Sequence, residues 1–411
     1  MRKAPAGGLS IALCRLALAS VVLAVAGTAL PAPPGSRSPA SASLATIPDQ
    51  SGTIRTVLGT IDPSELGVTL PHEHIFIDFT LPLDAPERWR LAFRQRPETA
   101  EEIGIWNMAF TELSQRELML ENLWRNRDSL LLEDPDTALK ELAEFQKQGG
   151  SAVVDVTSVG LGRSPQKLAD IARRSGLHII MGTGWYLSAW HPDDMGERSV
   201  EELTASIVKD LVEGVDGTGI RAGIIGEVSA MYISTSPDSA ETKALRAAAR
   251  ASRMTGAALS LHQWIRDGEM LELSLGILEE EGVDLSRVIL GHIDAVSALD
   301  TAYLESLMDR GLTLEFDLFG TPYLLHHPAL DDRPMADAIV ALVKAGYGDR
   351  LLMSQDVCTK LQQRAYGGKG FGYVQKQVVP YLLEHGLSEA DIRQIQVKNP
   401  ARLLAFVAPR I

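Results

Sequence analysis

The chain has 411 residues, of which 45% are hydrophobic and 22% are charged, and its formal net charge at pH 7 is −14. This composition excludes a fibrous or intrinsically disordered protein and supplies enough apolar side chains for one large core or two smaller ones. The acidic balance also argues against nucleic acid and other polyanions as partners.

The first residues have the pattern of a secretory signal peptide. Basic residues precede an apolar run over residues 16–26, and a tract rich in Pro, Ser and Ala follows it. Ala-x-Ala sites end at Ala26 and Ala42, so we predict a signal peptide over residues 1–26, with 42 as the alternative cut, and a linker over residues 27–51. An uncleaved anchor is the alternative, although the run is short for a hydrocarbon core of roughly 30 Å. No twin-arginine pair precedes the run, so the sequence predicts Sec-type export to the periplasm or the extracellular space, with no membrane partner after cleavage.

From residue 52 onward, short runs rich in β-branched residues alternate with amphipathic stretches of helical period, which is typical of βαβ units. We predict eight strands, at Leu66–His72, Ser151–Thr157, Leu177–Gly184, Ala222–Glu227, Ala257–His262, Arg287–His292, Gly311–Asp317 and Leu351–Asp356. The intervening helices are predicted from Asp134-Pro135 to Gly149-Gly150 and at Pro165–Ser175, Val200–Glu213, Ala240–Thr255, Met270–Glu281, Leu299–Arg310, Met335–Ala345 and Tyr373–His385. Eight such alternations predict a (β/α)₈ TIM barrel over residues 52–411. A doubly wound open sheet is the alternative fold.

One connection is far longer than the others. Roughly 75 residues separate the first two strands, whereas an ordinary crossover needs far fewer. Residues 83–132 of this connection contain three tryptophans among charged residues. We predict a mostly helical insertion, which either covers the barrel mouth as a lid or packs beside the barrel.

Candidate metal ligands stand at the ends of five predicted strands. His72 and His74 lie two positions apart, so both imidazoles leave the same face of the chain. Each of the other four candidates ends a different apolar run; they are Glu227, His262, His292 and Asp356. A single histidine at a strand end is more often an ordinary polar group. The carboxyl ends of barrel strands meet at one face, however, and the joint placement predicts a single metal site there.

The ligand types indicate which metals the site would hold. Imidazoles and carboxylates without thiolate suit Zn²⁺ best, with Mn²⁺, Fe²⁺ or Co²⁺ as alternatives. Six ligands exceed the need of one catalytic zinc, so we predict two divalent ions bridged by Glu227. One ion would be held by His72, His74 and Asp356, and the other by His262 and His292.

Such a site predicts hydrolysis, because two ions that share a hydroxide activate it as a nucleophile. Asp356 can act both as a ligand and as the general base. Asp294, two residues after His292, is a candidate to orient an imidazole from behind the ligands.

Loops at the same face supply candidate substrate contacts, namely Trp185, Tyr186, Asp317 and Tyr323. Aromatic side chains there either line an apolar cavity or merely cap the barrel. Three cations could hold an anionic part of a substrate, although a solvated role is favoured for each; they are Arg163, Lys360 and Arg364. Cys358 would be the only cysteine after the signal peptide, and we expect it to be a small buried side chain.

Several of these segments together resemble the phosphotriesterase family of the amidohydrolase superfamily, and within it the phosphotriesterase-related branch. They read Gly-Val-Thr-Leu-Pro-His72-Glu-His74, Arg-Ala-Gly-Ile-Ile-Gly-Glu227, Leu-Gly-His292-Ile-Asp294, Phe-Asp317-Leu-Phe-Gly, Met-Ser-Gln-Asp356 and Lys398-Asn399-Pro400. The resemblance covers nearly the whole chain after the linker. It implies a (β/α)₈ barrel with a binuclear metal site formed by the ligands named above.

The segment before Glu227 departs from one part of that family. Organophosphate-hydrolysing members bridge their metals with a carbamylated lysine on the fourth strand, whereas this chain has Ile225-Gly226-Glu227. A bridging glutamate is similar to the phosphotriesterase-related branch. The resemblance therefore implies an exported hydrolase that cleaves a small carboxylic ester, lactone or amide. An organophosphate triester hydrolase and a non-catalytic metal- or ligand-binding barrel are the alternatives, and a homodimer is the oligomer that we consider.

Overall fold

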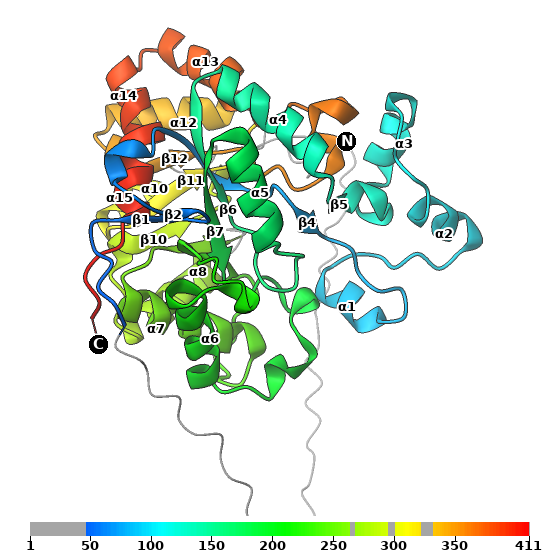
Figure 1. The fold of residues 1–411 in the computed structure, drawn as a ribbon, viewed down its shortest axis with the longest axis horizontal. Coiled ribbons are helices and arrows are strands. Elements are labelled where there is room, and N and C mark those ends of the chain that lie inside the picture. Colours follow the sequence, from blue (N-terminus) through cyan, green and yellow to red (C-terminus); the bar gives the residue numbers. More distant parts are fainter. Residues whose placement is uncertain (1–46, 264–267, 295–300, 322–331, 411) are drawn as a thin grey trace, which may run out of the picture. The chain divides into compact units, whose positions relative to one another are not determined.

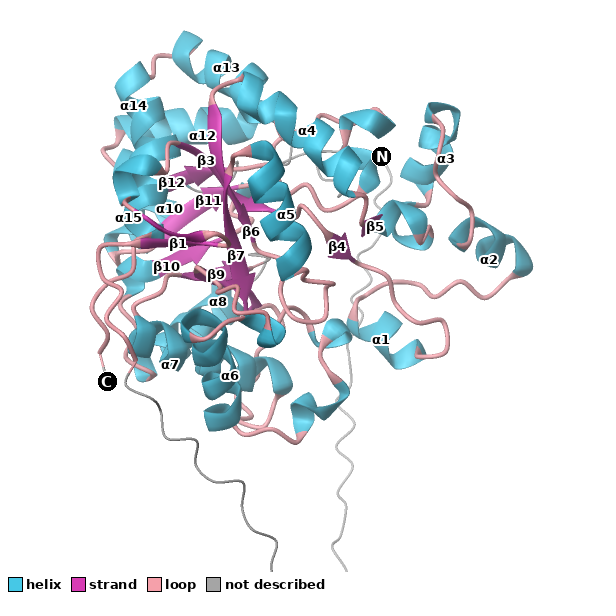
Figure 2. Ribbon diagram, viewed as in Figure 1, coloured by secondary structure: helices cyan, strands magenta, loops and turns pink. Residues whose placement is uncertain are grey.

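The computed structural model describes residues 47–263, 268–294, 301–321 and 332–410. The predicted signal peptide and most of the predicted linker lie outside these residues. Eight parallel strands form a nearly closed barrel with helices around it, in the order β12-β11-β10-β9-β8-β7-β6-β3 (Figure 1, Figure 2). Their bounds are β3 Val68–Glu73, β6 Gly150–Asp155, β7 His178–Thr183, β8 Ile224–Ser229, β9 Leu259–His262, β10 Val288–Leu290, β11 Thr313–Phe316 and β12 Leu351–Met353. The TIM-barrel prediction is confirmed, and every predicted strand overlaps an observed one.

Alternating side chains of the strands build two separate cores. Val153 of β6 packs in the large core between the strands and the helices, whereas its neighbours Ala152 and Val154 belong to a smaller core. That smaller core contains side chains from most of the strands and fills the barrel, as the period of two requires. Ile54 of the β1 strand (Ile54–Thr56), which pairs with β2 (Gly59–Ile61), and Leu403 of α15 (Asn399–Leu404) belong to this smaller core.

The helices that connect the strands, and those that follow the last strand, form the outer layer (Figure 2). They are α4 Pro135–Lys147, α5 Pro165–Ser175, α6 Val200–Val212, α7 Ala240–Thr255, α8 Gly268–Glu280, α10 Thr301–Asp309, α12 Asp332–Lys344, α13 Val379–Glu384 and α14 Glu389–Arg393. The α12 helix begins three residues before the predicted start, because Pro334 is tolerated in a first helical turn. Within the part of the chain that is described, no helix is long and apolar enough to cross a membrane.

A glutamate joins the first and last strands, where the barrel closes. Glu73 is the last residue of β3 and lies between His72 and His74 in the sequence, and its carboxylate faces the end of β12. It accepts hydrogen bonds from Ser354 Oγ at 2.8 Å, from the Gln355 backbone N–H at 3.0 Å and from the Val357 N–H at 2.8 Å. Ser354 Oγ also accepts a bond from the His72 backbone N–H at 3.1 Å. These bonds hold the segment that carries Asp356 beside the segment that carries His72.

We expect Glu73→Gln to lower the free energy of unfolding by about 1–3 kcal/mol, because the amide NH₂ must face one of two buried backbone N–H groups. Chemical denaturation monitored by circular dichroism measures this change. Glu87→Gln on the exposed side of α1 (Pro86–Leu91) is the matched control and should leave stability unchanged. Equal stability of the two variants would contradict a role for Glu73 in closing the barrel.

The insertion at residues 83–132 is mostly helical and leaves the barrel after β3 (Figure 1). It contains α1, α2 (Ala100–Trp106) and α3 (Arg116–Glu121). A short antiparallel pair brings its two ends together, because β4 (Ile77–Asp78) pairs with β5 (Leu131–Leu132). The insertion is therefore anchored at its base to the end of the barrel that carries the candidate ligands.

Candidate metal centre

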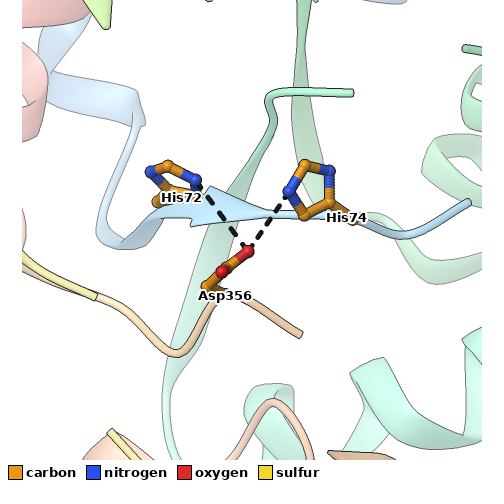
Figure 3. A group of neighbouring side chains, drawn as sticks. All are labelled: His72, His74 and Asp356. Carbon is orange, nitrogen blue, oxygen red and sulfur yellow. Dashed lines mark ion pairs between the residues drawn. The ribbon is translucent and has the colours of Figure 1, made fainter. Parts of the chain in front are cut away.

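Three of the six candidate ligands converge where β3 and β12 end (Figure 3). His74 Nε2 lies 3.2 Å from Asp356 Oδ1, and His72 Nε2 lies 3.9 Å from the same oxygen. Both histidines are buried, whereas the Asp356 side chain keeps 15% of its surface exposed. The two imidazole nitrogens and the carboxylate oxygen thus surround one position that a cation could occupy.

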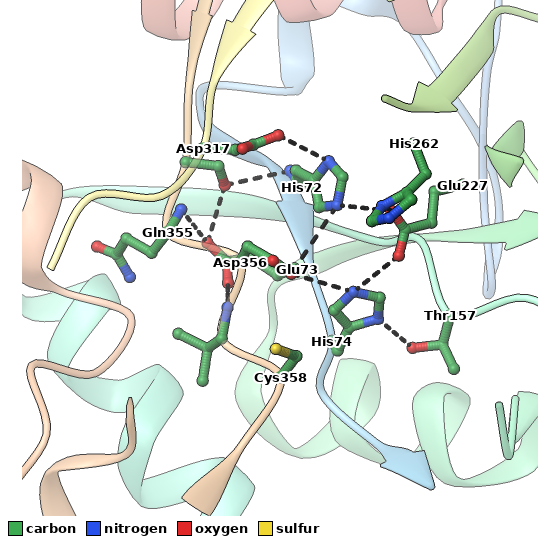
Figure 4. A network of polar contacts seen from close by, with 12 residues as sticks. His72, Glu73, His74, Thr157, Glu227, His262, Asp317, Gln355, Asp356 and Cys358 are labelled. Atoms are coloured by element: carbon green, nitrogen blue, oxygen red, sulfur yellow. Dashed lines mark hydrogen bonds and ion pairs between the residues drawn. The ribbon is translucent and has the colours of Figure 1, made fainter. Parts of the chain in front are cut away.

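The other three candidates, Glu227, His262 and His292, form a second group beside the first. Glu227 Oε2 lies 2.9 Å from His262 Nδ1 and 3.5 Å from His292 Nε2. The other oxygen of Glu227, Oε1, lies 3.4 Å from His74 Nε2 in the first group. Figure 4 shows Glu227 next to His262, with His72 and His74 close by. The Glu227 carboxylate therefore lies between the two groups, as a bridging ligand must.

The six candidate ligands form a cage, and polar partners contact the ring nitrogens of His72, His74 and His292 that point away from it. His74 Nδ1 contacts Thr157 Oγ1 at 2.8 Å, and His292 Nδ1 contacts Asp317 Oδ1 at 2.9 Å. His72 Nδ1 lies 3.0 Å from Glu315 Oε2 and 3.2 Å from Asp317 Oδ2. A carboxylate or hydroxyl acceptor behind each of these rings favours a proton on Nδ1 and leaves the Nε2 lone pair for a metal.

The centre has a negative environment that favours positive charge. Burial alone would lower the pKa of the His74 imidazole, but Asp356 and Glu227 outweigh burial and raise that pKa to about 9. Burial alone would raise the pKa of Glu227, but His262, His292 and His72 hold it well below its usual range. Burial alone would also raise the pKa of Asp317, but His292 and His72 keep it below its usual range. The carboxylates around His72, His74 and His292 outweigh burial and raise the pKa of each of these imidazoles, whereas burial lowers the pKa of His262. The negative surroundings that favour a proton on three of the imidazoles favour a divalent cation for the same electrostatic reason.

Two further observations fit a metal. His72 Nε2 and Asp356 Oδ1 are buried and have no hydrogen-bond partner among the described residues, although buried polar atoms normally have one. His292 and Asp356 also have left-handed backbones, with φ of 55° and 48°. Such conformations cost of order 1–3 kcal/mol in non-glycine residues and cluster at functional sites.

A cavity of about 230 Å³ opens beside this cage. Its walls are mainly apolar and aromatic, and they include His262, His292 and Asp356. This volume is below the roughly 300–1,000 Å³ of pockets for drug-sized ligands, so the cavity suits a small substrate.

The predicted substrate contacts fall at different places. Tyr186 lines the cavity, and its hydroxyl lies 3.1 Å from His262 Nε2. Trp185 is buried and is not among the described residues that line the cavity. Asp317 is predicted to contact substrate, but it lies fully buried behind His72 and His292, because its two carboxylate oxygens are engaged by the Nδ1 atoms of these imidazoles at 3.2 Å and 2.9 Å. Tyr323 lies outside the described residues.

The sequence predicts that Asp294 orients an imidazole, whereas in the structure it supports Asp317, the residue that contacts the imidazoles. Asp294 Oδ2 accepts a hydrogen bond from the Asp317 backbone N–H at 3.1 Å, so it supports the residue that orients the imidazoles. Burial, reinforced by the neighbouring Asp317 carboxylate, raises the pKa of Asp294 well above its usual range. Sequence reasoning missed Glu73, Thr157 and Glu315. For Glu315 a signal existed, because Thr313, Glu315 and Asp317 place polar side chains on one face of a buried strand.

A cage of imidazoles and carboxylates at the carboxyl ends of TIM-barrel strands, beside a small apolar cavity, defines a hydrolase with a candidate metal centre. A family model, the phosphotriesterase family, matches residues 52–404. The chain belongs to the phosphotriesterase family, which confirms the resemblance and the hydrolase class predicted from the sequence.

Individual relatives agree with this assignment. The N-acetyltaurine hydrolase of Dictyostelium discoideum is 33% identical over 373 residues, which cover 87% of this chain and 99% of that protein. The crystal structure of a resiniferatoxin-binding protein from Rhodobacter sphaeroides has a TM-score of 0.76 and 34% identity, covering 86% of this chain and 95% of that one. A lactonase from Listeria monocytogenes has a TM-score of 0.67 and 27% identity, with coverage of 86% and 99%.

Proposed function

We propose that this protein hydrolyses a small carboxylic amide, with two divalent cations, most readily Zn²⁺, in the cage described above. The observation that carries the proposal is the pair of ligand groups on either side of Glu227, next to a cavity of small volume. The relative named as an N-acetyltaurine hydrolase supports an amide as the substrate, and the Listeria lactonase supports acyl chemistry in general.

The residues of the chain divide the work of amide hydrolysis between them. When bound by the six candidate ligands, two divalent cations would supply Lewis-acid chemistry, activating water as a nucleophile and polarising the substrate carbonyl. Asp356 stands at the boundary of cage and cavity, so its carboxylate can take a proton from the attacking water. As the oxygen of water bonds to the carbonyl carbon and the C–N bond breaks, Asp356 returns that proton to the departing amine. Asp317, Glu315 and Thr157 keep the imidazoles in position throughout.

A substrate panel tests the proposal. The mature protein, loaded with Zn²⁺ or Mn²⁺, is assayed with N-acetyltaurine, γ-butyrolactone, 4-nitrophenyl acetate and diethyl 4-nitrophenyl phosphate. We expect the highest kcat/KM for the amide. A preference for the phosphate would instead favour an organophosphate triester hydrolase. Metal-loaded protein that hydrolyses none of these would favour a barrel that only binds ligands.

Export is part of the same proposal and rests on the signal-peptide pattern in the sequence. We expect expression of the full chain in a bacterial host to give a soluble extracytoplasmic protein whose N-terminus lies between Gly27 and Ser51, as determined by N-terminal sequencing. Recovery of Met1 in the membrane fraction would show that the apolar run is an anchor.

A further inference from the structure

A cation from the insertion faces the cavity beside the metal centre. Arg94 lines this cavity together with His262, His292 and Asp356. Its Nη1 donates a hydrogen bond to the backbone carbonyl of Phe79 at 2.8 Å, and no ion pair joins it to an acidic side chain within the described residues. It is half-buried, and the cavity gives a ligand access to it.

The three cations selected from the sequence differ from Arg94 in this respect, because each already has an acidic partner. Arg163 pairs with Asp210 at 2.9 Å, Lys360 with Asp128 at 2.8 Å and Arg364 with Glu144 at 2.8 Å. Their charges are balanced by these acidic partners, so the three side chains are less available to bind an anionic group of a substrate. Arg94 is the basic residue among the described residues that line the cavity, and it has no acidic partner among the described residues.

Aromatic rings fix the position of the Arg94 guanidinium. Its central carbon lies 4.3 Å from the ring centroid of Trp124, 4.9 Å from that of Trp190 and 5.1 Å from that of Phe79. These contacts orient the cation and stabilise it partly, but they do not neutralise it. Burial lowers the pKa of Arg94 to about 10, so the side chain remains charged at neutral pH. Even a half-buried charge without a counter-ion is unfavourable, and an anion entering the cavity would supply the missing charge.

The cation and the metal centre are close enough for one small molecule to reach both. The Tyr186 ring contacts both parts of the cavity, because its centroid is 4.5 Å from that of His262 and 5.7 Å from that of Phe79, the ring over which the Arg94 guanidinium lies. All of these groups line the same cavity. A short substrate could therefore place its reacting carbonyl at the cage and a charged group at Arg94.

We propose that Arg94 binds the anionic end of the substrate, and that the substrate is an N-acyl amide whose short amine portion ends in a sulfonate or a carboxylate. This inference rests on the proposed amide hydrolysis and names its substrate class. The guanidinium fork matches the oxygens of either anion and can bond two of them at once. The rings around Arg94 would cover the methylene groups between the amide and the anion.

Three acetyl amides with the same two-carbon spacer test the inference. N-acetyltaurine ends in a sulfonate, N-acetyl-β-alanine in a carboxylate and N-acetylethanolamine in a neutral hydroxyl. We expect the wild-type protein to prefer at least one anionic amide over the neutral one, and the better of the two identifies the anion. Arg94→Met should raise KM for that anionic amide by about 10–100-fold, the range for loss of a charge-assisted hydrogen bond, with less than about a threefold change for the neutral amide.

Two variants control this result. Arg90→Met removes the same charge from an exposed position on the same segment and should leave all three substrates unaffected. Arg94→Lys keeps the charge but loses the fork, so it should retain part of the preference. Equal losses on charged and neutral amides in Arg94→Met would overturn the assignment of Arg94.

A binding measurement on wild-type protein keeps the inference separate from the proposed function. Propane-1-sulfonate should quench the fluorescence of Trp124 and Trp190 at concentrations at least tenfold lower than propan-1-ol, with or without metal. Absence of amide hydrolysis combined with sulfonate binding would refute the proposed function and leave the anion site standing. Sulfonate binding no tighter than that of the alcohol would refute the anion site, whatever the protein hydrolyses.

Discussion

Asp356→Asn should lower kcat on the preferred substrate by roughly 10²–10⁴, the range for loss of a positioned general base. Asparagine keeps the shape of the side chain and one oxygen that can coordinate a cation, but it has almost no basicity. Asp356 is the carboxylate that faces both His74 and the cavity, so no equivalent group among the described cavity walls replaces it. Steady-state kinetics combined with metal analysis by mass spectrometry measures both effects, and metal content should change much less than kcat.

The pH profile supplies a second measurement on the same variant. Wild-type activity should rise with pH through the ionisation of the attacking water, which comparable zinc sites bring to a pKa of about 7. Near wild-type turnover of Asp356→Asn at full metal occupancy would show that Asp356 is only a ligand. The proton would then have to leave by another group, and the mechanism proposed above would be wrong.

Metal content should approach two ions per chain in the purified mature protein, and it should fall by about one ion in His292→Ala. His292 Nε2 faces Glu227 and His262, so its loss empties one position while His72, His74 and Asp356 still surround the other. His72→Ala should have the corresponding effect on the first position. A cation that is missing from either position can no longer activate water or polarise the substrate. We therefore expect kcat/KM to fall by several orders of magnitude in both variants.

A histidine far from the cage controls this experiment. His385 follows α13 at the surface and stacks on Tyr381 at 3.8 Å, so His385→Ala should keep the full metal content. One tightly held ion in the wild type, with no change in His292→Ala, would refute the binuclear assignment.

The sequence alone predicted the barrel and the six candidate ligands, because both depend on local patterns. Strands such as β6 and β8 are short, apolar and bounded by helical stretches, and buried parallel strands need these properties. His72, Glu227 and His262 stand at or near the ends of such strands. Since parallel strands of one barrel share an active-site face, knowing the strand ends was sufficient to bring these residues together.

Only the tertiary structure decided which polar residues face the cavity and which lie behind the ligands. Asp317 ends its predicted strand as His262 does, yet it lies under the cage, because the stagger of neighbouring strands sets the depth of each side chain. Glu73 finds its partners more than 280 residues later in the sequence, at Ser354, Gln355 and Val357. Arg94 belongs to the insertion at residues 83–132, whose pattern of apolar residues does not indicate how the insertion packs against the barrel. Its place beside the metal centre follows from long-range packing against Phe79, Trp124 and Trp190, which no local pattern encodes.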